Sequence, residues 1–240
     1  LKDSVELKIN TERRNNTRAY HSATHLLHES LRRVLGSHVT QKGSLVEPSR
    51  LRFDFSHMKP IPTDEIDKIE NFVNSMVSKK SDVKTRLMTP DEAVENGALA
   101  LFGEKYGDTV RTIKFGCSME LCGGTHVENT KDIWHFILLH EGAVASGVRR
   151  IEAITGEFAK DFFISNSNKF KEIKKVLQNT KDPLKSIVTI QEENSDLKKQ
   201  IQTLLKEKGK NLKTALKNEI SEMNGVNFLA KQVDLDANGI

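Results

Sequence analysis

Residues 20–31 read YHSATHLLHESL, and much later in the chain residues 121–126 read LCGGTH. If the first stretch is helical, His21 and His25 lie one turn apart and point to the same side. In the second stretch two adjacent glycines disfavour a helix and favour a tight turn, which brings a thiol and an imidazole towards one point. Core packing requires neither arrangement. Together the two stretches predict a metal site, and with it a fold that joins them.

The predicted ligands are one cysteine and three histidines, namely His21, His25, Cys122 and His126. A thiolate and neutral imidazoles in tetrahedral array suit Zn2+, with bonds of about 2.0–2.1 Å to nitrogen and about 2.3 Å to sulfur. Each half alone has an ordinary alternative, a packed histidine pair or a buried cysteine. The stretches also lack the Cys-x-x-Cys of zinc fingers and the His-Glu-x-x-His of metalloproteases. The zinc interpretation therefore depends on both halves meeting. His28 falls near the same helix face, where polar packing is its alternative role.

Composition limits the class of protein. The net charge of +4 and the isoelectric point of about 8.9 permit an anionic partner such as RNA without requiring one. Two cysteines exclude a disulfide framework and favour a reducing compartment, which we take to be the cytoplasm. The sequence has no apolar run of about 18 residues and no signal peptide at its start. Because the chain opens on Leu1, targeting signals could lie outside it.

Hydrophobic periodicity predicts a mixed α+β region over residues 1–155. Helices are expected at 17–35, with Thr17 as N-cap, at 63–80, capped by Thr63 and Asp64, and at 89–97. Strands are expected at 4–9, 38–41, 44–47, 51–56, 82–88, 109–115, 133–142 and 147–156, with turns at Lys42-Gly43 and Pro48-Ser49.

The pattern changes at Gly156. From there to about Met223 no strand is predicted, and Leu197, Ile201 and Leu204 follow coiled-coil spacing. We expect a helical arm over 156–224, divided into two helices at Pro183. Its apolar stripe needs a partner surface, either the other helix of an antiparallel hairpin or another chain through weak self-association. Residues 225–240 read as the first strand of a further, truncated domain.

Four longer stretches of the sequence carry a family resemblance, namely residues 21–57, 98–116, 118–127 and 147–156. They resemble the editing domain of alanyl-tRNA synthetases over about residues 15–155, and so also free-standing alanyl-tRNA editing proteins. The resemblance implies a zinc-containing editing domain of mixed sheet and helix, followed by a helical arm.

The resemblance also implies an activity. An alanine site cannot strongly reject glycine or serine, since one methyl or hydroxyl is worth only about 1–3 kcal/mol. A second site then hydrolyses Ser-tRNA(Ala) and Gly-tRNA(Ala), with the acceptor end of tRNA(Ala) as partner. In the full-length enzyme ATP and alanine would bind an aminoacylation domain upstream. A zinc-stapled module that binds tRNA or dimerises without catalysis is the alternative.

The resemblance assigns the four predicted ligands to zinc and gives two further residues a part in editing. Thr24 would sense the wrong amino acid, unless its hydroxyl only bonds its own helix backbone. Gln41 would orient water or the terminal ribose, unless it is an exposed strand residue. The basic candidates for tRNA phosphates are Lys42, Arg52, Arg149 and Arg150, each with a surface or ion-pair role as its alternative. Zinc itself is expected to be structural, with an opened coordination position as the second possibility.

Overall fold

The computed structural model describes residues 5–99 and 107–232. The chain divides into two compact units, residues 1–166 and 167–240, which are described separately. Residue 4 of the first predicted strand and residues 233–240 of the predicted terminal domain lie outside the described ranges. Within those ranges no helix is long and apolar enough to cross a membrane.

The helix α1, Thr11–Leu35, begins earlier than predicted. Asn10 caps it by accepting a hydrogen bond from the backbone N–H of Arg13 at 2.9 Å, whereas the hydroxyl of Thr17 donates within the helix to the Arg13 carbonyl. The expected N-cap was wrong because the first turns are polar and mostly exposed, so they carry no apolar periodicity. The predicted end is confirmed, since Gly36 follows with a φ of 118°.

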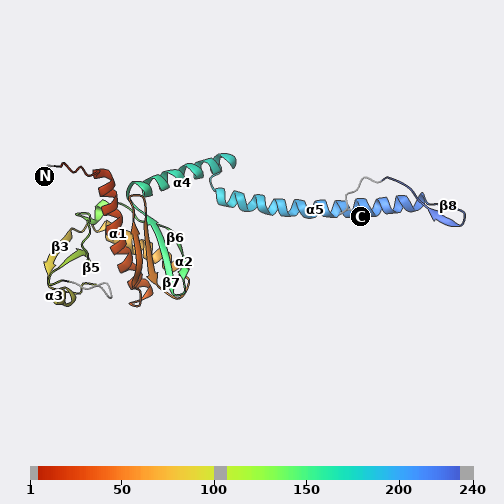
Figure 1. Ribbon diagram of the computed structural model, residues 1–240. Coiled ribbons are helices and arrows are strands. Elements are labelled where there is room, and N and C mark those ends of the chain that lie inside the picture. The colour runs from red at the N-terminus through yellow and green to blue at the C-terminus, as the bar shows by residue number, and fades with distance from the viewer. Residues whose placement is uncertain (1–4, 100–106, 233–240) are drawn as a thin grey trace. The chain divides into compact units, whose positions relative to one another are not determined.

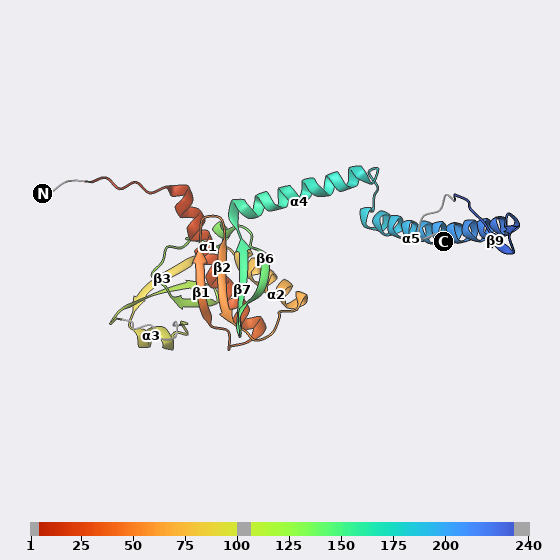
Figure 2. The same cartoon turned by 45° about the vertical axis from the view of Figure 1, so that its right-hand side comes forward.

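Four antiparallel strands form the main sheet in the order β1-β2-β7-β6, and Figure 2 shows them side by side. Their bounds are Gln41–Val46 for β1, Leu51–Ser56 for β2, Ile137–Ala145 for β6 and Val148–Ile154 for β7. The strands predicted at 38–41 and 44–47 are thus one strand, and no turn separates them. Instead the register with β2 shifts between Gln41 and Gly43, as in a β-bulge.

A smaller antiparallel sheet has the order β3-β4-β5, with bounds Val83–Met88, Val110–Phe115 and Ser118–Leu121. The helix α3, Pro90–Glu95, follows β3 and is capped by Thr89 with Glu92 in a capping box. The helix α2, Thr63–Ser78, has Pro62 at its N-cap and no side-chain cap, so the capping role predicted for Thr63 and Asp64 was wrong. A short 3-10 helix η1, Thr130–Ile133, precedes β6.

Helix α1 joins these parts into one core, because it contacts β1 and β2 of the large sheet, β5 of the small sheet and α2. Figure 1 shows β3 and β5 on one side of α1 and the larger sheet on the other. The core includes Leu26, Leu27 and Leu31 of α1 with Phe53, Phe55, Ile69, Phe115 and Ile151. The predicted α+β class is confirmed. The histidine-bearing helix is buried between the sheets, which brings its polar residues against β5 and the turn that follows.

Residues 5–9, predicted as a strand, form none. Val5, Leu7 and Ile9 are exposed at 77%, 87% and 61%, so the alternation of apolar residues does not mark a buried face. A strand also needs a neighbour for its backbone hydrogen bonds. Among the described strands none pairs with this segment.

Two helices follow the first sheet domain, α4 over Gly156–Val176 and α5 over Pro183–Asn218. Pro183 opens α5 as its first residue, as predicted, and Asp182 caps it. No described side chain of α5 is buried, so its apolar stripe is uncovered within the described chain.

The helical pattern does not reach Met223. Instead β8, Ser221–Met223, pairs with β9, Val226–Phe228, across a turn in which Asn224 and Gly225 have φ values of 53° and 76°. Two positive φ angles are those of a tight hairpin turn, for which Asn-Gly is the preferred sequence. The described strand of residues 225–240, β9, is the second strand of this hairpin, and the further domain stays a prediction.

Candidate metal centre

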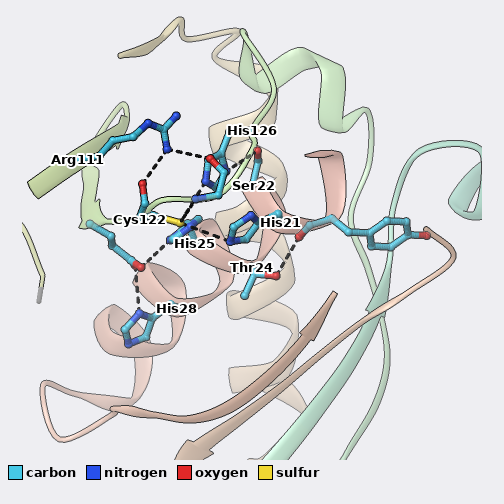
Figure 3. Close-up of polar contacts among 11 residues, drawn as sticks. His21, Ser22, Thr24, His25, His28, Arg111, Cys122 and His126 are labelled. Carbon is cyan, nitrogen blue, oxygen red and sulfur yellow. Dashed lines mark hydrogen bonds and ion pairs between the residues drawn. The ribbon is translucent and has the colours of Figure 1, made fainter. Parts of the chain in front are cut away.

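The structure brings the four predicted ligands together. His21 and His25 come from α1, and Cys122 and His126 come from the turn after β5 (Figure 3). One ligand atom from each residue lies within 4.8 Å of all the others. The Cys122 sulfur is 3.5 Å from Nε2 of His21 and 3.3 Å from Nε2 of His126. A ligand set of three imidazoles and one thiolate, gathered around one point, fits a zinc ion.

The turn depends on a missing side chain at Gly124. A Cβ placed there would overlap the ring of His21, so only glycine lets the turn approach α1 this closely. Arg111 on β4 fixes the same turn, because one terminal nitrogen donates to the carbonyls of Cys122 and Gly124 at 2.7 and 2.8 Å. The Gly124 N–H also donates to the Cys122 sulfur at 3.4 Å. The sequence analysis did not identify Arg111.

The protonation states of Cys122 and His126 suit metal binding. Burial acts to raise the pKa of the Cys122 thiol, but the surrounding imidazoles of His126, His21 and His25 outweigh it and lower the pKa to about 3. Burial lowers the pKa of His126 to about 4. At neutral pH the site therefore offers a thiolate and a neutral imidazole, which are the forms that bind metals.

Glu120 on β5 orients two histidines of α1. Its two carboxylate oxygens lie 2.6 Å from Nδ1 of His25 and 3.1 Å from Nδ1 of His28. The carboxylate holds the proton on Nδ1 of His25, and the opposite nitrogen, Nε2, is buried with no hydrogen-bond partner. A buried ring nitrogen left free by a carboxylate on the other nitrogen is the usual arrangement of a metal ligand.

Strong coupling links these groups in the metal-free chain. Burial acts to lower the pKa of His25, but the charge of Glu120 raises it to about 9. Burial acts in turn to raise the pKa of Glu120, while His25 and His28 lower it to about 2. Sequence analysis missed Glu120. Its position two residues before Cys122, on a strand face turned to the core, is the signal that could have found it.

Ser22 fixes the tautomer of the last candidate ligand, His126. Its hydroxyl donates to the Arg18 carbonyl at 2.8 Å and accepts from the Val127 N–H at 3.1 Å. Since the hydroxyl proton is already used, the 3.2 Å contact to Nδ1 of His126 assigns the ring proton to that nitrogen. Nε2 of His126 then faces the Cys122 sulfur with its lone pair. Sequence analysis also missed this role.

The two residues expected to take part in editing, Thr24 and Gln41, lie on different elements. Thr24 is buried, and its hydroxyl donates to the Tyr20 carbonyl at 2.9 Å, which is the backbone-bonding alternative (Figure 3). Its oxygen can still accept a hydrogen bond. Gln41 begins β1, opposite Phe55, and is half-buried. It is not among the residues of the metal cluster.

Most of the basic candidates are engaged in ion pairs. Arg149 is buried and pairs with Glu141, and Arg150 donates to both oxygens of Asp54 at 2.7 Å. Nε of Arg52 lies 3.9 Å from the same Asp54 carboxylate. These three arginines therefore have the ion-pair role that was stated as the alternative to binding tRNA phosphates. Lys42 is exposed on β1.

Comparison with known proteins relates the chain to a family. Residues 110–152, from β4 to β7, match the threonyl and alanyl tRNA synthetase second additional domain. Over 233 residues the chain is 56% identical to an alanine–tRNA ligase of Christiangramia forsetii, covering 97% of this chain and 27% of that relative. The chain belongs to the alanine–tRNA ligase family. The family resemblance expected from the sequence is thus confirmed.

Other relatives agree with this membership. The alanine–tRNA ligase of Flavobacterium psychrophilum is 54% identical over 229 residues, covering 95% of the chain and 26% of that relative. That of Parvibaculum lavamentivorans is 45% identical over 247 residues, covering 98% and 28%. The chain spans about a quarter of the length of these alanine–tRNA ligases. The matched domain contains Cys122, His126 and Glu120, whereas the two α1 ligands precede it.

Proposed function

We propose that this chain hydrolyses the ester bond of mischarged tRNA(Ala), with Ser-tRNA(Ala) and Gly-tRNA(Ala) as substrates. The observation that carries the proposal is the cluster of His21, His25, Cys122 and His126, in which α1 supplies the first two residues and the matched second additional domain supplies the last two. Such a reaction is needed because glycine and serine are close to alanine in size. An alanine site discriminates against one methyl or one hydroxyl by only about 1–3 kcal/mol, so misacylated products require removal.

The proposed cofactor is Zn2+, held by the four clustered side chains. Their buried free nitrogen, depressed thiol pKa and carboxylate-oriented imidazole support this choice. When bound, zinc would supply a Lewis acid and a rigid link between α1 and the turn. Four protein ligands complete a tetrahedral shell, so we assign it mainly the linking role.

The chain's own residues would position the ester. An aminoacyl ester is already labile, so orientation and electrostatics account for most of the required acceleration. Thr24 lies between two ligands on α1, and its oxygen retains the capacity to accept a hydrogen bond from a serine hydroxyl. Gln41, at the start of β1, is proposed to orient water or the terminal ribose. The proposal includes tRNA(Ala) as partner and a cytoplasmic location. ATP and alanine would bind the aminoacylation domain of the whole ligase.

One observation favours a second function. Because the shell is full with four protein ligands, the site could serve only as a staple within a tRNA-binding or dimerisation module. The exposed apolar residues Leu197, Ile201 and Leu204 on α5 would then be part of a contact surface. Such a staple needs no hydroxyl at Thr24 and no amide at Gln41, which distinguishes it from the hydrolase.

The deciding experiment incubates the full 240-residue chain with Ser-tRNA(Ala), Gly-tRNA(Ala) and Ala-tRNA(Ala) and measures single-turnover deacylation. We expect the first two esters to be hydrolysed faster than the third. Metal analysis should find about one zinc per chain, lost in the Cys122→Ala, His126→Ala double variant and kept in Cys117→Ala. Cys117 is the matched control because it is the other, exposed thiol. Spontaneous rates on all three esters would exclude the hydrolase, and unchanged zinc in the double variant would exclude the metal site.

A further inference from the structure

The small sheet presents two chemically different faces. Its inner face carries Ile113, Phe115 and Glu120, which are buried in the core or beside the metal ligands. Because side chains alternate along a strand, the neighbours of these residues point to the opposite face. That outer face carries Lys84 and Arg86 of β3 and Lys114 of β4, all exposed.

A groove of about 440 Å³ lies on this outer face. Its lining runs from Ser81, two residues before β3, to Met88 at the end of β3, roughly 23 Å at about 3.3 Å per residue. At one end α3 covers the sheet, where Ala93 and Ala98 pack with Val110. The rest of the face is left open by the described elements, and the three cations line this open part.

The register places like charges against each other. Lys84 and Lys114 are directly opposite in the β3–β4 pairing, and Arg86 is two residues further along β3 on the same face. Like charges at directly opposed positions destabilise a sheet. Within the described ranges no carboxylate forms an ion pair with Lys84, Arg86 or Lys114. The two opposed lysines therefore do not stabilise each other, and a bound anion would relieve their repulsion.

The remaining charged side chain among the described lining residues forms no ion pair with these cations. Asp82 also lines it, and its carboxylate accepts a hydrogen bond from the Asn129 amide at 2.9 Å. The buried hydroxyl of Thr112 faces the Arg86 carbonyl at 3.3 Å. The described lining residues thus lack the converging buried donors that enclose one small phosphate, and they offer cations spread along a strand instead.

We propose that this groove binds the phosphodiester backbone of RNA, specifically the acceptor arm of a tRNA. The assignment of tRNA rests on the proposed function, whereas the preference for an extended polyanion rests on the groove's length and its row of cations. Phosphate contacts of this kind position a nucleic acid without reading its sequence. Through β4 and β5 the groove shares one sheet with Arg111 and Glu120, which position the ligand turn and His25. An RNA strand held on the outer face is therefore anchored to the element that supports the metal centre.

The test measures binding of uncharged, deproteinised tRNA(Ala) to the full chain at several salt concentrations. The variant Lys84→Gln, Lys114→Gln removes two cations without adding bulk, and Lys59→Gln, Lys169→Gln removes two exposed lysines elsewhere. Each lost phosphate contact lowers the slope of log affinity against log salt by about 0.7–0.9. For the groove variant we expect the slope of log affinity against log salt to be smaller in magnitude by about 1.4–1.8. Its affinity for tRNA(Ala) at low salt should be roughly tenfold weaker. The control variant should keep both.

Folding of the groove variant is checked by its melting temperature, which should stay equal or rise because like-charge repulsion is relieved. An unchanged salt slope, or an equal loss in the control variant, would overturn the proposal. Tight binding of inorganic phosphate or an acidic peptide at the groove, without any effect of the variant on tRNA, would overturn it as well. If wild type binds tRNA through the groove yet hydrolyses no ester, the proposed function fails while the groove assignment stands.

Discussion

Replacing Glu120 by glutamine tests how the centre is organised. The carboxylate accepts hydrogen bonds from Nδ1 of His25 at 2.6 Å and Nδ1 of His28 at 3.1 Å, with all three residues buried. Glutamine keeps the shape but has only one acceptor oxygen, and its amide nitrogen donates. One histidine contact is lost, or His28 must change tautomer. The contact that remains is also weaker, because a hydrogen bond to a charged acceptor is about twice as strong as a neutral one.

The expected magnitude follows from this loss. Removing the partner that orients a ligating histidine typically lowers metal affinity about 10- to 100-fold. That range equals about 1.4–2.7 kcal/mol of binding free energy. The zinc affinity of Glu120→Gln should therefore be reduced by this factor, measured by competition against a chromophoric chelator at fixed pH.

The control is Glu128→Gln, which removes an exposed carboxylate two residues after His126 and makes the same change in net charge. Its zinc affinity should stay within about twofold of wild type, since an exposed charge near a site is screened by solvent and salt. Equal affinities for Glu120→Gln and wild type, or an equal loss in the control, would refute the view that the carboxylate orients His25 for metal binding.

Gly124→Ala should reduce zinc content, because its Cβ overlaps the His21 ring, whereas Gly123→Ala has open space and should keep the metal. Thr24→Val should slow Ser-tRNA(Ala) hydrolysis roughly 5- to 150-fold, because an unmade hydrogen bond costs about 1–3 kcal/mol, and it should slow Gly-tRNA(Ala) hydrolysis less. Equal losses on both esters would show that the Thr24 hydroxyl only supports its own helix through the Tyr20 carbonyl. Leu204→Asp should leave thermal stability unchanged, since this side chain is 63% exposed, but abolish any self-association seen by sedimentation; persistence of a dimer would show that the stripe is not the contact. In the metal-free chain, the pKa of Cys122 is lowered from 9.0 to about 3 and that of His126 from 6.5 to about 4. The stability that Cys122 contributes is therefore lost as pH falls from about 9 towards 3, and that of His126 as pH falls from about 6.5 towards 4. Urea midpoints across this window should fall less steeply in Cys122→Ser; an identical slope would contradict the thiolate's contribution.

Local sequence patterns predicted much of the first unit. The spacing of His21 and His25 depends only on the helical repeat, and the Gly123-Gly124 pair excludes a helix, so both halves of the cluster were identifiable. Pro183 marked a helix start because its ring is compatible only with the first turn. Errors arose where exposed segments lack apolar periodicity, as at the start of α1. The hairpin at Asn224-Gly225 was missed although its turn sequence is a strong local signal.

What the sequence by itself determined are the identities and local spacing of the four candidate ligands, the α+β class and the family resemblance. Tertiary structure alone decided which distant residues support them. Glu120, Ser22 and Arg111 reach the ligands only because α1 packs against β5 and the following turn, a contact that no sequence period encodes. The ion pairs that engage Arg149 and Arg150 likewise depend on strand register. So does the groove of Lys84 and Lys114, because opposed positions on paired strands are set by hydrogen bonding between distant segments.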